Sequence, residues 1–237
     1  MKKNKMPIIN YKFKINNSIG DKEVKAAVKV IKSGKLSGFV GAKSKLFFGG
    51  EKVRKFEKEW SKFFKVKYAI SVNSWTSGLI ASIGALGLDP GDEVIVSPWT
   101  MCASATAILH YNCIPVFADI EERTFCIDPK SVEKNISKKT KAIVAVDIFG
   151  QCCDYNALKK IARKHNIKII CDSAQSILAK YKGKYSGTIG DIGGYSLNYH
   201  KHINTGEGGV IVTNNKKYAK KLYAIRNHGE ANTDSNK

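Results

Sequence analysis

The run Lys168-Ile-Ile-Cys-Asp172 is short and apolar and ends in a carboxylate. An unbroken apolar run of this length is typical of a strand in a sheet that helices cover on both faces. In open α/β sheets, ligands gather at the carboxyl ends of such strands. We therefore predict a buried strand at residues 168–172, with Asp172 as a candidate functional side chain at its end.

Similar short runs lie on both sides of this one and alternate with helical patterns. The predicted strands are residues 68–72, 93–97, 114–118, 142–146, 168–172 and 210–213. Helical patterns fit between most of them and after the last, at residues 76–86, 102–111, 154–165 and 218–227. This alternation predicts an α/β fold of three layers, in which a mostly parallel sheet is covered by helices on both faces.

The beginning of the chain has helical patterns and no strand signal. Val24, Val28 and Ile31 recur at helical spacing, which predicts a helix at residues 21–33. After a loop with several glycines, residues 51–64 place apolar and aromatic residues on one stripe of a second, amphipathic helix. We expect that stripe to belong to the core.

The net charge of +20 is unevenly distributed along the chain. Residues 1–67 carry +14, whereas residues 68–129 carry −6. Only four of the 40 basic residues are arginine, although arginine is the better fork for phosphates and base edges. This distribution is typical of solvated lysine faces with a mild attraction for anionic substrates, and we expect no nucleic-acid partner.

The rest of the composition bears on compartment and metal chemistry. No apolar run approaches the roughly 18 residues of a membrane span, and the first seven residues lack the apolar segment of a signal peptide. We therefore expect a cytoplasmic protein without membrane contact. The six cysteines include no C-x-x-C pair, and the vicinal Cys152 and Cys153 have no ligands at a metal-binding spacing. Reduced thiols and no metal site are expected.

Lys201 lies in Ser196-Leu-Asn-Tyr-His-Lys201-His-Ile-Asn-Thr-Gly-Glu-Gly-Gly209, between an expected strand end and a glycine-rich turn. A lysine held in this way can be kept close to a cofactor aldehyde. Lys201 and Asp172 form the pair that pyridoxal phosphate needs, because the lysine forms a Schiff base and the aspartate keeps the pyridine nitrogen protonated. Each residue alone is weak support, since a strand-end aspartate is more often a helix cap.

Hydroxyl groups suited to a phosphate occur at two places. Asn73-Ser-Trp-Thr-Ser-Gly-Leu79 joins a predicted strand to a helix, and its backbone amides are joined there by the hydroxyls of Thr76 and Ser77. A helix N-cap also explains these residues and, when they are taken alone, is the favoured explanation. Ser196 precedes Lys201 by five residues and is placed to reach the same phosphate.

Side chains suited to the cofactor ring follow two strands. Gln175 lies three residues after Asp172 and is placed to donate to a phenolic oxygen of the cofactor while the aspartate pairs with the ring nitrogen. Trp99 and Met101 follow another predicted strand and are suited to covering a flat ring, although core packing is the commoner use of both residue types.

Several motifs resemble, in their order and spacing, those of one known family. They are Val72-Asn-Ser-Trp-Thr-Ser-Gly-Leu79, Leu88-Asp-Pro-Gly-Asp-Glu-Val-Ile-Val96, Pro115-Val-Phe-Ala-Asp119, Asp172-Ser-Ala-Gln175, Gly190-Asp-Ile-Gly-Gly194 and the stretch from Lys201 to Gly209. The family is the DegT family of nucleotide-sugar aminotransferases, which depend on pyridoxal phosphate (PLP). The resemblance is specific for the family and much less specific for the sugar.

The resemblance implies a fold-type I transferase in which residues 51–237 form the PLP-binding large domain. Residues 1–50 are then the helix and loop segment of an incomplete small domain. The implied reaction moves an amino group from L-glutamate, by way of pyridoxamine phosphate, to a keto group of a nucleotide-linked sugar. The resemblance also implies a homodimer in which both subunits contribute residues to each site.

The resemblance also implies roles for single residues. Lys201 is the Schiff-base lysine, Asp172 is the partner of the ring nitrogen and Gln175 contacts the ring hydroxyl. Met101 stands where the family usually has an aromatic residue over the ring, so stacking is altered there. The positions that match phosphate-binding residues are Thr76, Ser77 and Ser196.

Two alternatives stay open. Some members of the family carry histidine at the Schiff-base position and are sugar dehydratases, so Lys201 favours transamination. Family members generally continue well beyond this length into a portion that completes the small domain, so the resemblance implies a truncated chain. A non-catalytic family member is therefore the second alternative, and residues 21–33 are expected to lack their packing partner.

Overall fold

The computed structural model describes residues 19–42 and 44–230. The first seven residues, for which the sequence predicts no signal peptide, lie outside this part. The chain divides into two compact units, Met1–Leu36 and Ser37–Lys237. The assignment of residues 1–50 and 51–237 to a small and a large domain stays a prediction.

The first unit contains one described helix, α1 (Asp21–Lys32). At its start the Glu23 carboxylate accepts a hydrogen bond from the backbone N–H of Gly20 at 2.8 Å, which satisfies a donor that a helix start leaves free. The apolar side chains that predicted this helix, those of Val24, Val28 and Ile31, are exposed.

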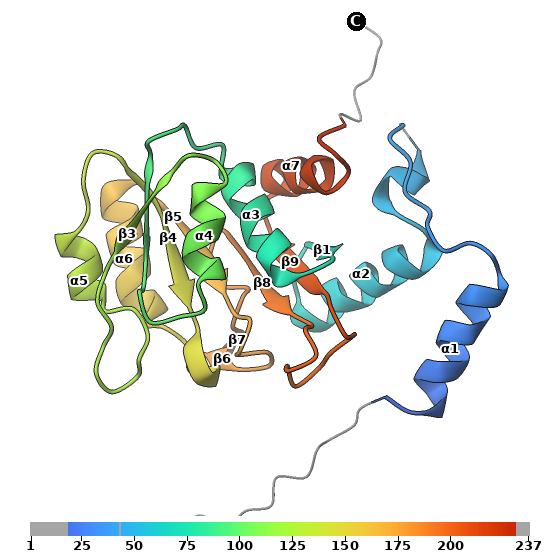
Figure 1. Cartoon of the computed structure of the whole chain (residues 1–237). Coiled ribbons are helices and arrows are strands. Elements are labelled where there is room, and N and C mark those ends of the chain that lie inside the picture. Colours follow the sequence, from blue (N-terminus) through green and yellow to red (C-terminus); the bar gives the residue numbers. More distant parts are fainter. Residues whose placement is uncertain (1–18, 43, 231–237) are drawn as a thin grey trace, which may run out of the picture. The chain divides into compact units, whose positions relative to one another are not determined.

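The second unit is built on a seven-stranded sheet with the order β1-β9-β8-β5-β4-β2-β3 (Figure 1). The strands are β1 (Tyr68–Val72), β2 (Glu93–Val96), β3 (Ile114–Phe117), β4 (Thr140–Val146), β5 (Lys168–Asp172), β8 (Ile192–Ser196) and β9 (Gly209–Thr213). Only β9 runs antiparallel to its neighbours β1 and β8, and the other pairs are parallel. The predicted α/β fold with a mostly parallel sheet is confirmed.

The direction of each crossover decides which face of the sheet its helix covers. The helices are α2 (Glu51–Phe64), α3 (Trp75–Leu86), α4 (Ala103–Leu109), α5 (Pro129–Lys134), α6 (Tyr155–His165) and α7 (Lys216–Arg226), with short 3₁₀ turns η1 (Lys45–Phe48) and η2 (Ile148–Gly150). After β1 the chain crosses the sheet to β2 and then β3. After β3 it returns in the opposite direction to β4 and then β5. Because such crossovers are right-handed, α3 and α4 cover one face and α5 and α6 the other.

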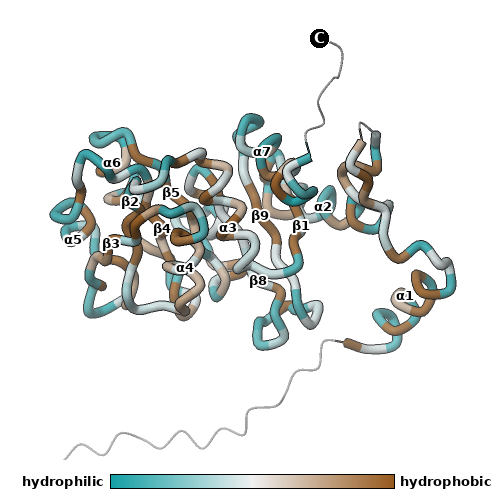
Figure 2. The backbone as a smooth tube through the Cα atoms, turned by 45° about the horizontal axis from the view of Figure 1, so that its top comes forward, coloured by the Kyte–Doolittle hydropathy of each residue, from teal (hydrophilic) through white to brown (hydrophobic). Residues whose placement is uncertain are grey.

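Hydrophobic residues predominate along the strands, which are mostly brown in Figure 2. The main core includes fully buried side chains of β2, β4 and β5, among them Ile95, Ile143 and Ile170. A second cluster joins Trp60 and Phe64 of α2 to Tyr195 of β8. Of the stripe predicted for residues 51–64, Trp60 is thus part of the core and Phe56 packs against it. The prediction was wrong for Phe63, which is 55% exposed while its neighbour Phe64 is buried.

Apart from the 3₁₀ turns, one helix and three strands were not predicted from the sequence. Strand β8 contains Gly193 and Gly194, and glycine weakens the strand signal because it has no side chain to pack. Helix α5 is only six residues long, although Asp128 and Pro129 at its start are typical of a helix beginning. The hairpin of β6 (Lys180–Tyr181) and β7 (Lys184–Tyr185) consists of two-residue strands.

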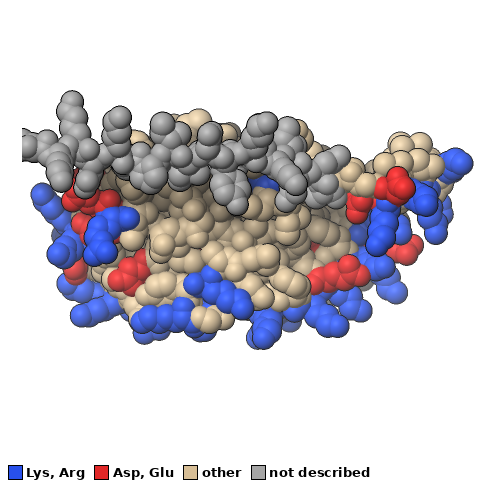
Figure 3. Space-filling view, turned by 90° about the horizontal axis from the view of Figure 1, so that it is seen from below, with Lys and Arg blue, Asp and Glu red and all other residues tan. Residues whose placement is uncertain are grey.

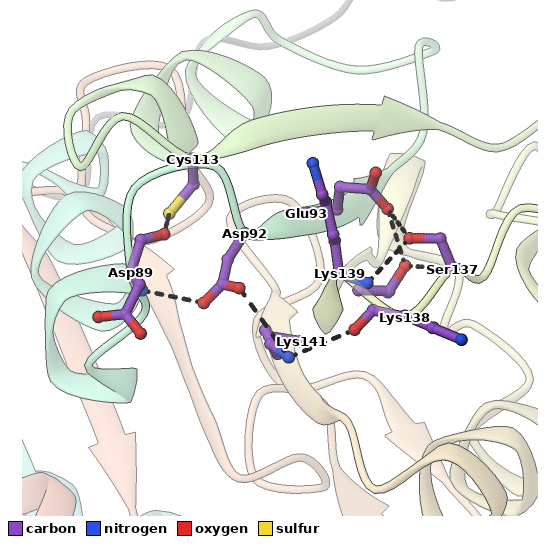
Figure 4. A network of polar contacts seen from close by, with 9 residues as sticks. Asp89, Asp92, Glu93, Cys113, Ser137, Lys138, Lys139 and Lys141 are labelled. Atoms are coloured by element: carbon purple, nitrogen blue, oxygen red, sulfur yellow. Dashed lines mark hydrogen bonds and ion pairs between the residues drawn. The ribbon is translucent and has the colours of Figure 1, made fainter.

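The amino ends of the parallel strands carry a network of charged and polar groups (Figure 4). Asp92 accepts a hydrogen bond from the backbone N–H of Asp89 at 2.9 Å and lies 3.9 Å from the Lys141 amine. Glu93 accepts hydrogen bonds from the hydroxyls of Ser137 and Thr140. These contacts link the start of β2 to the start of β4.

Candidate active site

The opposite edge of the sheet contains a cavity of about 450 Å³. The carboxyl ends of β1 and β8 lie there beside the first residue of β9, because Gly209 pairs with both Val72 and Ser196. Figure 3 views the molecule from this side, toward which the arrows of β4 and β8 point in Figure 1. Uncharged residues occupy the middle of the visible part of this face, and charged residues lie along its lower and left margins.

The cavity brings together six of the eight residues predicted for the site. They are Thr76, Met101, Asp172, Gln175, Ser196 and Lys201. Ser77 and Trp99 are not among its lining residues. Residues from four separate segments of the sequence therefore meet at the edge where the sequence predicted them.

Asp172 ends β5 and is almost completely buried, with 3% of its surface exposed. The Trp75 indole N–H donates to its Oδ1 at 2.6 Å, and the Ser104 hydroxyl donates to its Oδ2 at 2.7 Å. Burial raises the pKa of Asp172, and hydrogen bonds from Ser104, Trp75 and the backbone N–H of Ala174, together with the Lys201 charge, oppose this rise. The donors thus favour the ionised carboxylate in a desolvated place.

Trp75 and Ser104 were not predicted as site residues. Trp75 was visible only as part of a strand-to-helix junction, and Ser104 lies inside a short helix. Their bonds to Asp172 span 97 and 68 residues of sequence, so no local spacing indicates them.

The loop that carries Lys201 is closed by its own hydrogen bonds. Leu197 donates its backbone N–H to the Gly208 carbonyl at 2.8 Å, and the Thr205 N–H donates to the Leu197 carbonyl at 2.9 Å. The Lys201 N–H donates to the Asn198 carbonyl at 2.9 Å. Internal hydrogen bonds therefore stabilise the β8–β9 loop, which holds the partly buried Lys201 at the cavity.

The start of α3 offers both a helix cap and a suitable place for a phosphate. Ser74 is the N-cap, and its hydroxyl accepts the backbone N–H of Ser77 and donates to the Ser77 hydroxyl, each at 3.1 Å. Ser77 is thus engaged in capping, whereas Thr76 faces the cavity. A Cβ at Gly209 would come within 2.7 Å of the Trp75 backbone nitrogen, so only glycine lets β9 approach the helix start this closely.

Gln175 is oriented by the backbone of a neighbouring loop. Its Oε1 accepts the N–H of Phe149 at 2.8 Å, which leaves the NH₂ group as the free donor end of the amide. Phe149 has left-handed backbone angles (φ 53°, ψ 22°), which are uncommon for a non-glycine residue. The amide therefore presents a hydrogen-bond donor at the cavity.

Two of the predicted ring-covering residues are exposed. Met101 lines the cavity but is 66% exposed, and Trp99 is 51% exposed. The Trp99 ring centre lies 6.1 Å from that of Phe125, which lies 6.1 Å from that of Phe149. An exposed aromatic group thus adjoins the cavity.

These residues fit pyridoxal phosphate. One cavity contains the Lys201 amine for the aldehyde and the buried Asp172 carboxylate for the ring nitrogen. It also contains a helix start with hydroxyls for the phosphate. Among residues 19–42 and 44–230, no group of three or more His, Cys, Asp or Glu side chains is placed to hold a metal ion. In the same part of the chain, no helix has the length and apolar character needed to cross a membrane.

Comparison with known proteins adds independent information. Residues 40–237 match the model of the DegT/DnrJ/EryC1/StrS aminotransferase family. The spore coat polysaccharide biosynthesis protein SpsC of Bacillus subtilis is 38% identical over 89% of this chain and 51% of its own length. The GDP-perosamine synthase of Caulobacter vibrioides is 40% identical over 76% of this chain and 48% of its own length.

Solved structures agree with these relatives. An aminotransferase from Psychrobacter cryohalolentis has a TM-score of 0.83 and 36% identity, covering 90% of this chain and 52% of its own. The E. coli GDP-4-keto-6-deoxy-D-mannose-3-dehydratase, solved with bound hydrated PLP, has a TM-score of 0.80 and 31% identity, covering 90% and 53%. PLP is thus present in a related structure, in agreement with the predicted cofactor.

The chain spans about half the length of the curated relatives that it matches. Within that span, the family model covers the whole described part of the sheet and every residue of the cavity. The resemblance found in the sequence motifs is therefore confirmed, and this chain belongs to the DegT/DnrJ/EryC1/StrS aminotransferase family.

Proposed function

We propose that the protein uses PLP to transfer an amino group, with L-glutamate as the donor, to a keto group of a nucleotide-linked sugar. The observation that carries this proposal is that Lys201 and Asp172 line one cavity next to the start of α3. Relatives named as a GDP-perosamine synthase and a spore coat polysaccharide biosynthesis protein support the sugar substrate.

Lys201 and Asp172 carry the chemistry in this proposal. When bound, PLP supplies an electron sink for the carbon that loses its proton. Lys201 would be the residue that holds the aldehyde carbon of the cofactor. Its amine, when free, would be the base that takes a proton from the donor carbon and passes it on. Asp172 holds a proton on the ring nitrogen.

Other residues bind and orient in the proposed site. Gln175 donates its NH₂ group to the ring oxygen, and Met101 covers the ring. Phosphate contacts are assigned to the N–H and hydroxyl of Thr76, to the Ser77 hydroxyl, which accepts from Ser74 and keeps its own hydrogen to donate, and to the Ser196 hydroxyl, because a helix start favours an anion. Trp99, which is not a lining residue, is assigned to the outer rim of the site.

A sugar dehydratase is the second candidate function. The similarity to the E. coli dehydratase structure favours it. Lys201 favours transamination, because a lysine both bonds to the cofactor and moves the proton.

We also propose a cytoplasmic homodimer. The exposed apolar side chains of Trp99, Met101 and Phe149 beside the cavity support a second copy of the chain as the protein partner. Sedimentation velocity of the purified protein tests this proposal, and a single species of monomer mass at micromolar concentration contradicts it.

Transfer of isotope from labelled donor to sugar tests the proposed reaction. The protein is incubated with PLP, ¹⁵N-glutamate and a panel of nucleotide-linked keto sugars, and mass spectrometry follows the sugars. We expect ¹⁵N in a sugar product, and none with K201R. A deoxygenated keto sugar without ¹⁵N indicates the dehydratase instead. If glutamate keeps its ¹⁵N and neither sugar product forms, both enzymatic proposals are contradicted.

A further inference from the structure

Trp75 is the first residue of α3 and is buried, with 4% of its surface exposed. Its Nε1–H donates to Asp172 Oδ1 at 2.6 Å, which is short for such a bond. An indole N–H can only donate, whereas a hydroxyl such as that of Ser104 can turn and accept. The Trp75 contact is therefore compatible only with an acceptor at Oδ1, and it disfavours a proton on that oxygen.

Two glycines form a slot that fixes the indole ring. A Cβ at Gly194 of β8 would lie 2.1 Å from Trp75 Cζ3, and a Cβ at Gly78 of α3 would lie 2.5 Å from Trp75 Cε3. Neither glycine has a positive φ, so the backbone does not require glycine at these positions. At Gly78 the space is needed for the ring, and at Gly194 it is needed for both the ring and the Val210 carbonyl. A ring that cannot turn holds its N–H in one direction.

The hydrogen bonds to Asp172 leave room for one more. An ionised carboxylate accepts about four hydrogen bonds. Trp75 and the backbone N–H of Ala174, at 3.3 Å, donate to Oδ1, and Ser104 donates to Oδ2. One acceptor position is then left for a protonated ring nitrogen.

We infer that Trp75 is a positioning residue for the cofactor, which acts through Asp172 by holding its carboxylate ionised and in the orientation that receives the ring nitrogen. This inference rests on the proposed role of Asp172. It predicts that loss of the indole N–H weakens binding only of a cofactor that has a ring nitrogen.

The test compares PLP with its carbocyclic analogue, in which a C–H group replaces the ring nitrogen. Dissociation constants of both are measured by absorbance titration of the full chain, as wild type, W75F and W60F. Trp60 is the matched control, because it is also buried while its Nε1 has no hydrogen-bond partner among residues 19–42 and 44–230.

We expect wild type and W60F to bind PLP more tightly than the analogue. W75F is expected to bind PLP about tenfold more weakly than wild type and to bind the analogue equally well, because it lacks one hydrogen bond to a charged group. Equal weakening of PLP and analogue in W75F overturns the inference, since it is the result of a packing role alone.

A second variant covers the case in which W75F does not fold. G78A keeps the indole but pushes it out of its slot, and the clash involves side chains only. The same selective loss of PLP affinity is expected for G78A. If the ratio of the dissociation constants of PLP and the analogue is the same in G78A as in wild type, the inference is overturned. If wild type itself does not distinguish PLP from the analogue, the proposed role of Asp172 fails, and the inference falls with it.

Discussion

Acids at the two ends of the parallel strands have opposite surroundings. The amino edge is the end of the sheet where these strands begin, and the carboxyl edge is the end where they finish. At the amino edge, Asp92 and Glu93 are partly exposed and contact a lysine or hydroxyls of the next strand. At the carboxyl edge, Asp147 and Asp172 are buried and receive their hydrogen bonds from neutral donors. The acids at one edge therefore join strands, whereas those at the other edge are desolvated and lie close to a cavity.

Asp147 extends this contrast beyond the proposed catalytic residues. It follows β4 and is fully buried, and its carboxylate accepts hydrogen bonds from Tyr155, from Ser173 and from the backbone N–H of Cys153. Burial, with a smaller contribution from the Asp172 charge, raises the pKa of Asp147 to about 6. Its backbone N–H also donates to the Asp172 carbonyl at 2.9 Å. The two buried acids thus form one connected region.

The largest effect is expected from D172N at the carboxyl edge. Asparagine keeps the shape and an acceptor for Trp75 but cannot hold a proton on the ring nitrogen. We expect conversion of PLP to pyridoxamine phosphate by glutamate to slow by about three orders of magnitude, or roughly 4 kcal/mol. Stopped-flow absorbance measures this conversion, and a rate near that of wild type contradicts the role of Asp172.

The next largest effect is a pH dependence of stability caused by Asp147. Its pKa rises from 3.8 to about 6 on folding, so the folded state keeps a proton that the unfolded state has already lost. The stability from this group is complete below pH 3.8 and is lost as pH rises through 6. The loss amounts to roughly 3 kcal/mol.

D147N removes this dependence. The free energy of unfolding of D147N minus that of wild type is expected to be roughly 3 kcal/mol higher at pH 7 than at pH 3.5, because only wild type loses stability over this range. Urea unfolding at these two pH values measures the change. A difference between the two proteins that is the same at both pH values would show that Asp147 does not titrate in this way.

S196A sharpens the comparison at the carboxyl edge by separating the phosphate from the ring. Loss of one hydrogen bond to a charged group is expected to weaken PLP binding about tenfold. Binding of pyridoxal, which lacks the phosphate, is expected to be unchanged. If both ligands weaken equally, Ser196 does not contact the phosphate.

E93Q at the amino edge is expected to have the smallest effect. The amide keeps an acceptor for Ser137 and Thr140, and partly exposed charges contribute little to stability. We expect a change of less than about 1 kcal/mol in the free energy of unfolding and no change in the dissociation constant of PLP. A tenfold loss of PLP affinity would break the contrast between the edges.

The sequence predicted best what depends on local pattern. The strands at Tyr68–Val72 and Lys168–Asp172 and the helix at Glu51–Phe64 agree with the structure residue by residue, because their apolar periodicity is strong. Strand β8 was missed since its two glycines leave room for the indole of Trp75 and other neighbours. That requirement exists only in the folded state.

The candidate site was predictable where strand ends point to it. Asp172 and Lys201 follow from a strand end and a glycine-rich turn. The engagement of Ser77 in capping, the orientation of Gln175 by Phe149 and the bond of Trp75 to Asp172 join residues through the fold. Such contacts depend on which loops meet at the sheet edge, and single-sequence spacing does not contain that information.

Chemical labelling tests most directly the central claim that Lys201 binds the cofactor at the carboxyl edge. The purified protein is loaded with PLP, reduced with borohydride and digested, and the modified peptide is identified by mass spectrometry. With 36 lysines in the chain, the position of the label is a selective result. The account predicts a single major adduct on Lys201. An adduct on another lysine, or none in folded protein, would contradict it.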